Sequence, residues 1–157
     1  MLNTANNPEP DFKKMDISVN QSTIFWPVLA LMGWTFLILL LIPYQRFKGA
    51  FAGQVTAQDF HCGESDSVPS SIKLPNRIFM NLLEMPVLFY VLSLILFITH
   101  NVDSLFINLA WAYFAFRVLH SLVYLTYNHV VHRFLSFAIS NLIVVAIWAR
   151  LIFIFSR

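Results

Sequence analysis

The fold class is indicated most clearly by residues 77–99, which read RIFMNLLEMPVLFYVLSLILFIT. As a helix, this segment is long enough to cross a hydrocarbon core about 30 Å thick, which requires about 20 mostly apolar residues. Similar segments cover about residues 23–44, 104–128 and 132–155. Short connections join the last three segments, and short connections are typical of antiparallel neighbours. The sequence therefore predicts an all-α membrane protein, a four-transmembrane-helix up-and-down bundle.

The composition agrees with a chain that lies in a bilayer. Of the 157 residues, 58% are hydrophobic and 11% are charged, whereas soluble domains contain about 25% charged residues. The net charge of +2 is not gathered into a basic stripe, so a nucleic-acid partner is excluded. The single cysteine, Cys62, excludes an internal disulfide framework, and we interpret it as an ordinary loop thiol.

The chain divides into a tail and one membrane domain. Residues 1–22 are polar and are predicted to form an N-terminal tail, whereas residues 23–157 form the transmembrane domain with a long polar loop over residues 45–76. The sequence Ala50-Phe51-Ala52 resembles a signal-peptide cleavage site. The preceding apolar segment is too long for a signal peptide, however, and Arg46 and Lys48 intervene, so we expect a membrane span instead.

Basic residues flank the four spans unevenly. The side of the long loop has five, namely Arg46, Lys48, Lys73, Arg77 and Arg133, and the opposite side has three, namely Lys13, Lys14 and Arg157. Cytosolic flanks carry more Lys and Arg than the flanks across the membrane. We therefore expect the long loop in the cytosol and both termini outside it.

A polar stripe lies in the second predicted span. Arg77, Asn81 and Glu84 stand at positions i, i+4 and i+7, which places them on one face of a helix. The stripe descends roughly 10 Å from the loop side, at 1.5 Å per residue. Pro86 cannot donate a hydrogen bond to the Leu82 carbonyl, so the helix is expected to bend there. The bend would serve packing alone, or would leave a free acceptor beside the stripe.

A second polar stripe lies in the third predicted span and contains Arg117, His120, Ser121, Tyr124 and Asn128. A lone guanidinium at membrane depth is costly, and Glu84 is the only acidic residue inside any span. We therefore hypothesise an ion pair between Arg117 and Glu84, with a structural and a ligand-binding role both open.

Arg133 begins the fourth predicted span, where an arginine serves either as an interfacial anchor or as a functional group. The neighbouring His129 and His132 have no acidic or thiolate companion in the sequence, so a metal site is not expected.

These motifs resemble a known family. Residues 75–86, with the core Arg77-x3-Asn81-x2-Glu84, are similar to the second-helix signature of the MAPEG family, the membrane-associated proteins in eicosanoid and glutathione metabolism. Arg117, His120, Tyr124 and Arg133 resemble the third and fourth helices of that family, with the spacing of the microsomal prostaglandin E synthase type. The overall sequence character is similar to the bacterial branch, which favours the bacterial inner membrane over the endoplasmic reticulum.

The resemblance implies a homotrimer that binds glutathione as a co-substrate between subunits, with a lipophilic small molecule or lipid approaching from the bilayer. It assigns glutathione binding to Arg77, Asn81, Glu84, Arg117, His120 and Tyr124, and it assigns Arg133 the catalytic role of stabilising the glutathione thiolate. The expected activity is that of a glutathione transferase or peroxidase acting on a lipophilic electrophile or lipid hydroperoxide. Phe134 stands where the synthase type has a serine, with Ser136 two residues further on, which argues against prostaglandin isomerase activity.

Two other classes of function stay open on the sequence. A non-enzymatic lipid-binding scaffold of the same fold would retain the spans without using glutathione. A small transporter or channel is suggested by the charges of Glu84 and Arg117, but it needs a polar path that the apolar residues 95–98 and 105–107 interrupt.

Overall fold

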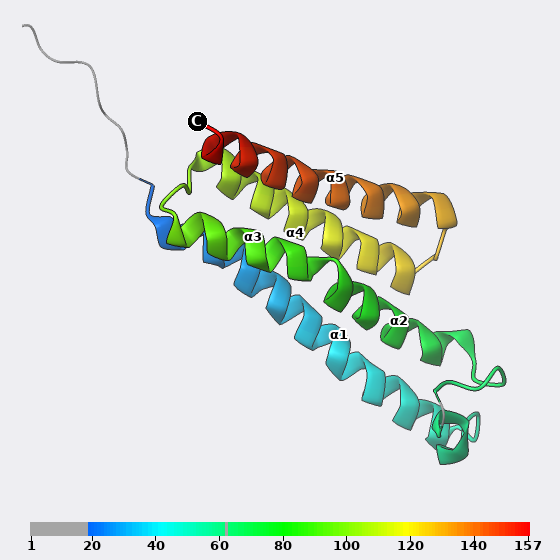
Figure 1. Cartoon of the computed structure of the whole chain (residues 1–157). Coiled ribbons are helices and arrows are strands. Elements are labelled where there is room, and N and C mark those ends of the chain that lie inside the picture. Colours follow the sequence, from blue (N-terminus) through cyan, green and yellow to red (C-terminus); the bar gives the residue numbers. More distant parts are fainter. Residues whose placement is uncertain (1–18, 62) are drawn as a thin grey trace, which may run out of the picture.

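The computed structural model describes residues 19–61 and 63–157, and in this part of the chain every regular element is a helix (Figure 1). In chain order the elements are η1 (Gln21–Ile24), α1 (Phe25–Phe51), η2 (Ala57–Phe60), α2 (Ser70–Glu84), α3 (Pro86–Ile98), α4 (Ser104–Leu125) and α5 (Val130–Phe155). The predictions for residues 1–18 and for Cys62 concern positions outside the described residues.

The predicted four-span bundle is confirmed. Four helical segments are long and apolar enough to cross a membrane, namely Gln21–Phe51, Ser70–Ile98, Ser104–Leu125 and Val130–Phe155. The second segment contains both α2 and α3, and successive spans run in opposite directions (Figure 1). α4 packs along α5, while α1 packs against α2 and α4.

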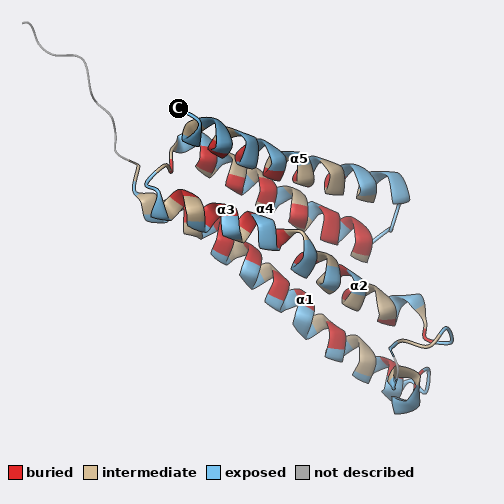
Figure 2. Ribbon diagram, viewed as in Figure 1, coloured by how far each residue is buried: buried red, intermediate tan, exposed pale blue. Residues whose placement is uncertain are grey.

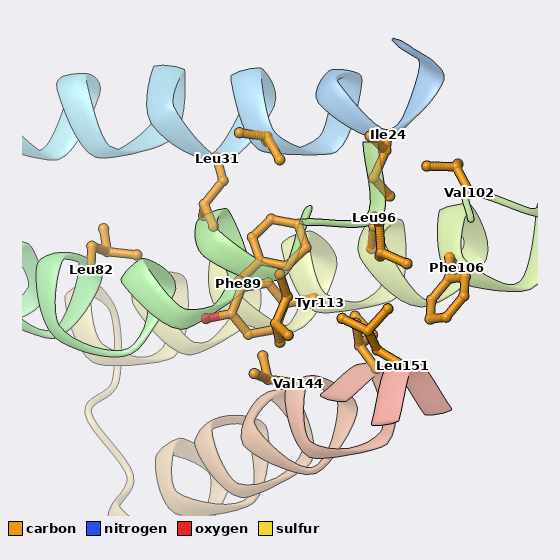
Figure 3. Close-up of a cluster of buried hydrophobic side chains, with 14 of the residues drawn as sticks. Ile24, Leu31, Leu82, Phe89, Leu96, Val102, Phe106, Tyr113, Val144 and Leu151 are labelled. Atoms are coloured by element: carbon orange, nitrogen blue, oxygen red, sulfur yellow. The ribbon is translucent and has the colours of Figure 1, made fainter. Parts of the chain in front are cut away.

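The bundle is held by an apolar core that receives side chains from every long helix. Leu31, Phe89, Phe106, Tyr113 and Leu151 are all buried in it and converge in Figure 3. The ring centroids of Phe89 and Tyr113 lie 4.5 Å apart, so α3 and α4 make an aromatic contact at the centre.

The outward faces of the helices are apolar as well. Leu40 and Leu142 are each 66% exposed, and many other large hydrophobic side chains are exposed as well. Figure 2 shows exposed residues, in pale blue, along the helices of the bundle. Water would disfavour so large an apolar surface, whereas lipid chains or a neighbouring subunit can cover it.

The second span is interrupted where Pro86 predicted a bend. α2 ends at Glu84, Met85 lies between the helices, and α3 starts at Pro86 (Figure 1). The Leu88 amide donates to the Met85 carbonyl at 3.2 Å, an i to i+3 bond that tightens this turn. Because of this break, α2 and α3 follow different directions.

The predicted ends of several segments were wrong. α1 continues beyond Tyr44 to Phe51, and α2 begins at Ser70 instead of Arg77, so the long loop covers only residues 52–69. Hydropathy reports the apolar part of a helix, whereas these polar extensions pack on each other outside it. A Cβ on the buried Gly49 would overlap the Ile72 side chain, which shows how closely α1 and α2 approach there.

Smaller corrections concern the other boundaries. η1 includes Gln21 and Ser22 of the expected tail, because the Gln21 side chain bonds both the Val102 amide, at 2.9 Å, and the Val102 carbonyl, at 3.2 Å. α4 ends at Leu125 and α5 begins at Val130, so their connection is longer than predicted.

The loop over residues 52–69 is organised around Asp59. Its carboxylate accepts hydrogen bonds from the Thr56 amide at 2.7 Å, the Thr56 hydroxyl at 2.9 Å, and the hydroxyls of Ser65 and Ser67 at 3.0 Å each. The Thr56 backbone bond is the largest cause that lowers the pKa of Asp59 from 3.8 to about 2. Nearby, Arg46 pairs with Glu64 at 3.3 Å and lies over the Phe60 ring.

Asp59→Asn is expected to open this loop at neutral pH, because the amide cannot accept all the hydrogen bonds that the carboxylate accepts. The carboxylate pKa is lowered by folding, so its contribution is complete above pH 3.8 and is lost as the pH falls through about 2. Hydrogen exchange of residues 52–69 should therefore be faster in the variant than in wild type at neutral pH. The difference in exchange rate should vanish near pH 2, where the wild-type carboxylate becomes protonated. Asp66→Asn, in the same loop, is the matched control. Equal exchange in wild type and Asp59→Asn would contradict the prediction.

A two-point ion pair connects α5 to the α3–α4 connection at the opposite end of the bundle. Arg150 donates to the Asp103 carboxylate at 2.8 and 2.6 Å and lies 4.3 Å from the centre of the Phe106 ring. Asp103 also caps α4 by accepting from the Phe106 amide at 3.0 Å. The Arg150 hydrogen bond is the main cause that lowers the pKa of Asp103. Arg150 raises the number of basic residues on this side from three to four, which weakens the predicted orientation bias.

Arg150→Met is expected to lower the free energy of unfolding by about 1 kcal/mol, the upper end for ion pairs at a surface, because both side chains are partly exposed. Asp103→Asn removes the charge but keeps an N-cap residue that serves about as well as aspartate. Thermal unfolding in detergent of both single variants and the double variant gives the coupling between the two side chains. Additive effects would show that the pair contributes nothing.

Candidate functional site

A pocket opens between α2, α4 and α5 at the end of the bundle where α5 begins. It has a volume of about 280 Å³ and is lined by Asn81, His120, Tyr124, Val130, Arg133, Phe134 and Phe137. Asn81, His120, Tyr124 and Arg133 are residues that the sequence analysis assigned to the site. Two polar stripes that are separate in the sequence thus meet in one cavity.

The break in the second span lies about one turn beyond Asn81, the α2 residue that lines the pocket. In the described part of the chain α3 contacts α5, but α2 does not. α3 therefore packs against α5, whereas α2 packs against α1 and α4. The break thus separates α3, which packs against α5, from α2, which lines the pocket without packing against α5.

Arg133 presents an unneutralised positive charge to the pocket. Its guanidinium carbon lies 4.3 Å from the centre of the Tyr124 ring, and Nη1 donates to the Asn128 side-chain oxygen at 2.8 Å. The ion pairs among the described residues are Arg46–Glu64 and Arg150–Asp103, so no carboxylate pairs with Arg133. The aromatic face and the amide orient the cation and leave its charge available to a ligand.

His120 connects α4 to the first turn of α5. Its Nδ1 lies 3.0 Å from the Arg133 carbonyl oxygen, and a carbonyl only accepts, so Nδ1 carries the hydrogen. In the neutral ring Nε2 is then an acceptor, and this atom is buried without a partner in the part of the chain that the structure describes. The ring also lies beside Phe137, with the centroids 5.7 Å apart.

Arg117 lies behind the pocket and is fully buried. Nε donates to the Tyr113 hydroxyl at 3.0 Å, and Nη2 lies 3.4 Å from the Asn141 side-chain oxygen on α5. The hypothesised ion pair with Glu84 is therefore wrong. The guanidinium carbon is 5.3 Å from the centre of the Phe137 ring, which lines the pocket, whereas Arg117 itself is not among the lining residues.

Arg77 and Glu84 lie on α2 about one turn on either side of Asn81, outside the residues that line the pocket. Both are exposed, and within the described residues neither side chain has a hydrogen bond or ion pair. Asn81 donates to the Arg77 carbonyl at 3.0 Å. The exposed side chains of Arg77 and Glu84 are free to contact a ligand at the rim of the pocket or a second copy of the chain.

Sequence reasoning missed the roles of Phe137 and Asn141. Arg133, Phe137 and Asn141 recur at every fourth residue of α5, which places them on one helix face. This spacing was the sequence pattern from which their shared location could have been predicted. Ser136 is buried and bonds the His132 and Arg133 carbonyls at 3.0 Å each, so it does not line the pocket.

The two histidines near the start of α5 lie beside each other. The rings of His129 and His132 are 4.6 Å apart, and His132 Nδ1 is 3.0 Å from the Tyr127 hydroxyl. Within residues 19–61 and 63–157 no group of three His, Cys, Asp or Glu side chains has the arrangement of a metal site.

A second, apolar cavity of about 410 Å³ lies between α3 and α5, further along the bundle. It is lined by Leu88, Val91, Leu92, Ile95, Val144, Val145 and Trp148. Its lining fits a hydrocarbon chain and offers no charged group.

Comparisons with known proteins agree with this arrangement. A family model described as MAPEG family matches residues 24–153, which include the second and third spans, nearly all of the first and fourth, and every residue of the pocket. The search of the curated proteins and the search of the solved structures each gave no match.

Proposed function

The chain belongs to the MAPEG family, and on this premise we propose that it is a membrane-bound glutathione-dependent transferase or peroxidase. The family includes glutathione transferases and peroxidases as well as other members. The proposed acceptor is a lipophilic electrophile or a lipid hydroperoxide that reaches the pocket from the bilayer.

The observation that carries the proposal is the free charge of Arg133 in an open pocket. A thiol has a pKa of about 8.5, and a nearby cation lowers it by stabilising the thiolate. Arg133 lies in the first turn of α5, where the helix dipole adds positive potential. A glutathione sulfur placed beside the guanidinium would therefore ionise more readily near neutral pH and react as the nucleophile.

The other groups of the pocket suit the rest of glutathione, which has two carboxylates, an ammonium and amide groups. His120 Nε2 offers a buried acceptor, Asn81 an amide, and Tyr124 a hydroxyl. Glu84 can pair with the ammonium, and Arg77 with a carboxylate, once a ligand or neighbouring chain reaches them. Arg117 keeps a structural role in this proposal, because it is fully buried and does not line the pocket.

The sulfur then reacts in one of two ways. With an electrophile, the thiolate forms a carbon–sulfur bond and the electron pair moves to the leaving or receiving atom. With a hydroperoxide, the sulfur attacks the peroxide oxygen, the alcohol leaves, and a second glutathione converts the oxidised sulfur to a disulfide and water. In both cases Arg133 holds the thiolate until the acceptor arrives.

We also propose a homotrimer with glutathione between subunits. One chain offers a cavity of about 280 Å³, at the lower limit of the roughly 300–1,000 Å³ typical of ligand pockets, while Arg77 and Glu84 remain exposed beside it. A neighbouring chain would complete the walls. Chemical crosslinking in mild detergent is expected to trap trimers, and a chain that stays monomeric at all crosslinker concentrations would contradict the intersubunit site.

For orientation, we propose that the pocket faces the cytosol together with residues 52–69. Five basic residues flank this side against four on the other, counting Arg150, so the bias is small. Proteolysis of intact vesicles tests this orientation when the vesicles are right-side-out, so that the cytosolic side of the membrane faces the vesicle lumen. A cytosolic loop is then protected from an added protease, whereas segments on the other side are cleaved. Cleavage at the termini and protection of the loop would support the proposed orientation, and the reverse pattern would contradict it.

The decisive experiment is calorimetry of the purified protein with glutathione, together with ultraviolet absorbance of the thiolate at neutral pH. Binding with a thiolate signal that S-methylglutathione does not give is the expected result. A folded sample that does not bind glutathione would reject the proposal.

A lipid-binding scaffold is the second candidate, and the apolar cavity between α3 and α5 favours it. This function predicts that purified protein retains a fatty acid or phospholipid and binds no glutathione. Lipid extraction and mass spectrometry of the same sample separate the two candidates.

A further inference from the structure

Asn128 lies in the α4–α5 connection, next to the pocket but not among the residues that line it, and bonds the Arg133 side chain. We propose that Asn128 is a positioning residue that aims the Arg133 guanidinium at the glutathione sulfur without neutralising its charge. This inference rests on the proposed function.

The backbone places Asn128 for this role. Its φ angle is +46°, a left-handed conformation that asparagine, aspartate and glycine tolerate better than other residues. The Asn128 amide donates to the Val123 carbonyl at 2.9 Å, which ties the turn to the last part of α4. The turn is therefore anchored, and the side chain leaves it in a defined direction toward α5.

The contact with Arg133 is short and specific. Asn128 Oδ1 accepts from Arg133 Nη1 at 2.8 Å, while the Tyr124 ring lies against the guanidinium and His120 bonds the Arg133 carbonyl. α4 and its C-terminal turn thus hold both the backbone and the cation of Arg133. Because the guanidinium is planar with fixed donors, fixing Nη1 also fixes the direction of the donors that remain.

The chemical type of the acceptor matters as much as its position. The amide oxygen of Asn128 is neutral, whereas a carboxylate there would form an ion pair and cancel the charge that a thiolate needs. The other titratable side chains near Arg133 are His120 and Tyr124 on α4, Tyr127 and His129 in the connection, and His132 on α5. None of these is an anion at neutral pH in its ordinary state, so the positive charge stays unopposed.

Two substitutions separate position from charge. Asn128→Gly keeps the left-handed backbone but removes the acceptor, so Arg133 loses its orientation. Asn128→Asp keeps both the backbone and the acceptor but adds a negative charge beside the guanidinium. His100→Gly is the matched control, since His100 has a φ of +55° in the connection at the other end of the bundle.

The readouts are the pKa of the bound glutathione thiol, from thiolate absorbance against pH, and kcat/KM for a model electrophile, 1-chloro-2,4-dinitrobenzene. Asn128→Asp is expected to raise the thiol pKa by at least one unit, so that the ratio of thiolate to thiol at neutral pH falls about tenfold. Asn128→Gly is expected to lower kcat/KM by roughly threefold to tenfold with a smaller shift of the thiol pKa, because the charge remains but is less well directed. His100→Gly should match wild type in both readouts.

The possible outcomes test the positioning role of Asn128 separately from the proposed glutathione-dependent function. If Asn128→Asp, folded by its thermal unfolding curve, has the wild-type thiol pKa and kcat/KM, the positioning role is rejected. If Asn128→Gly fails to fold, Asn128→Asp alone decides by the same criterion. A wild-type protein that binds no glutathione overturns the proposed function and the inference with it, whereas thiolate formation in wild type and in both Asn128 variants alike overturns the inference only.

Discussion

Arg133→Leu is expected to lower kcat/KM for glutathione-dependent turnover by about 100- to 1,000-fold, the usual effect of removing a group that stabilises developing or resident negative charge. The Arg133 guanidinium carbon lies 4.3 Å from the centre of the Tyr124 ring. Leucine keeps an apolar side chain at this position but has no charge to stabilise the thiolate. Glutathione should still bind, because Asn81, His120 and Tyr124 remain in the pocket. Calorimetry and thiolate absorbance on the same sample separate binding from ionisation.

Arg157, just beyond the C-terminal end of α5, provides a matched control for Arg133→Leu. Arg157 is exposed and lies 4.4 Å from the centre of the Phe153 ring, much as Arg133 lies over Tyr124, but far along the chain from the pocket. Arg157→Leu removes the same charge and should leave turnover unchanged. Arg133→Lys keeps the positive charge but replaces the planar guanidinium by an ammonium, so it should retain part of the activity that Arg133→Leu loses. Full activity of Arg133→Leu would exclude the arginine from thiolate stabilisation.

Arg117→Ala is expected to lower the free energy of unfolding by about 2–5 kcal/mol, the range for large core side chains replaced by alanine. The change leaves a cavity and removes the donors that face the Tyr113 hydroxyl and the Asn141 oxygen. Thermal unfolding in detergent, followed by size-exclusion chromatography, measures the loss.

Arg117→Met distinguishes the structural role from a ligand clamp. Methionine fills most of the space, and the arginine it replaces has a buried Nη1 without a partner in the described residues, so stability should change by only about 1 kcal/mol. Glutathione affinity should stay within a few-fold of wild type, since Arg117 is fully buried and does not line the pocket. A stable Arg117→Met protein with at least tenfold weaker glutathione binding would instead support the glutathione-binding role that the family resemblance implies for Arg117.

The sequence alone determined the membrane class, the number of spans and the position of the bend. Each of these is a local property, because about 20 apolar residues suffice to predict a span and one proline suffices to interrupt a helix. The polar stripes were also local, since helical periodicity places Arg77 with Asn81, and His120 with Tyr124, whatever lies opposite. Four of the seven predicted site residues accordingly line one pocket.

Only the tertiary structure decided which polar groups meet. The sequence suggested Glu84 for Arg117 because no other acid lies at membrane depth, yet Arg117 contacts Tyr113 and Asn141 while Glu84 stays exposed. The reason is geometric: α2 packs against α4 but not against α5, and Glu84 lies on the exposed face of α2, whereas Arg117 is buried and faces Asn141 on α5. Phe137 acquired its contacts with Arg117 and His120 in the same way, since the pairing of one helix face with another depends on the relative placement of whole helices, which no local pattern in the sequence records.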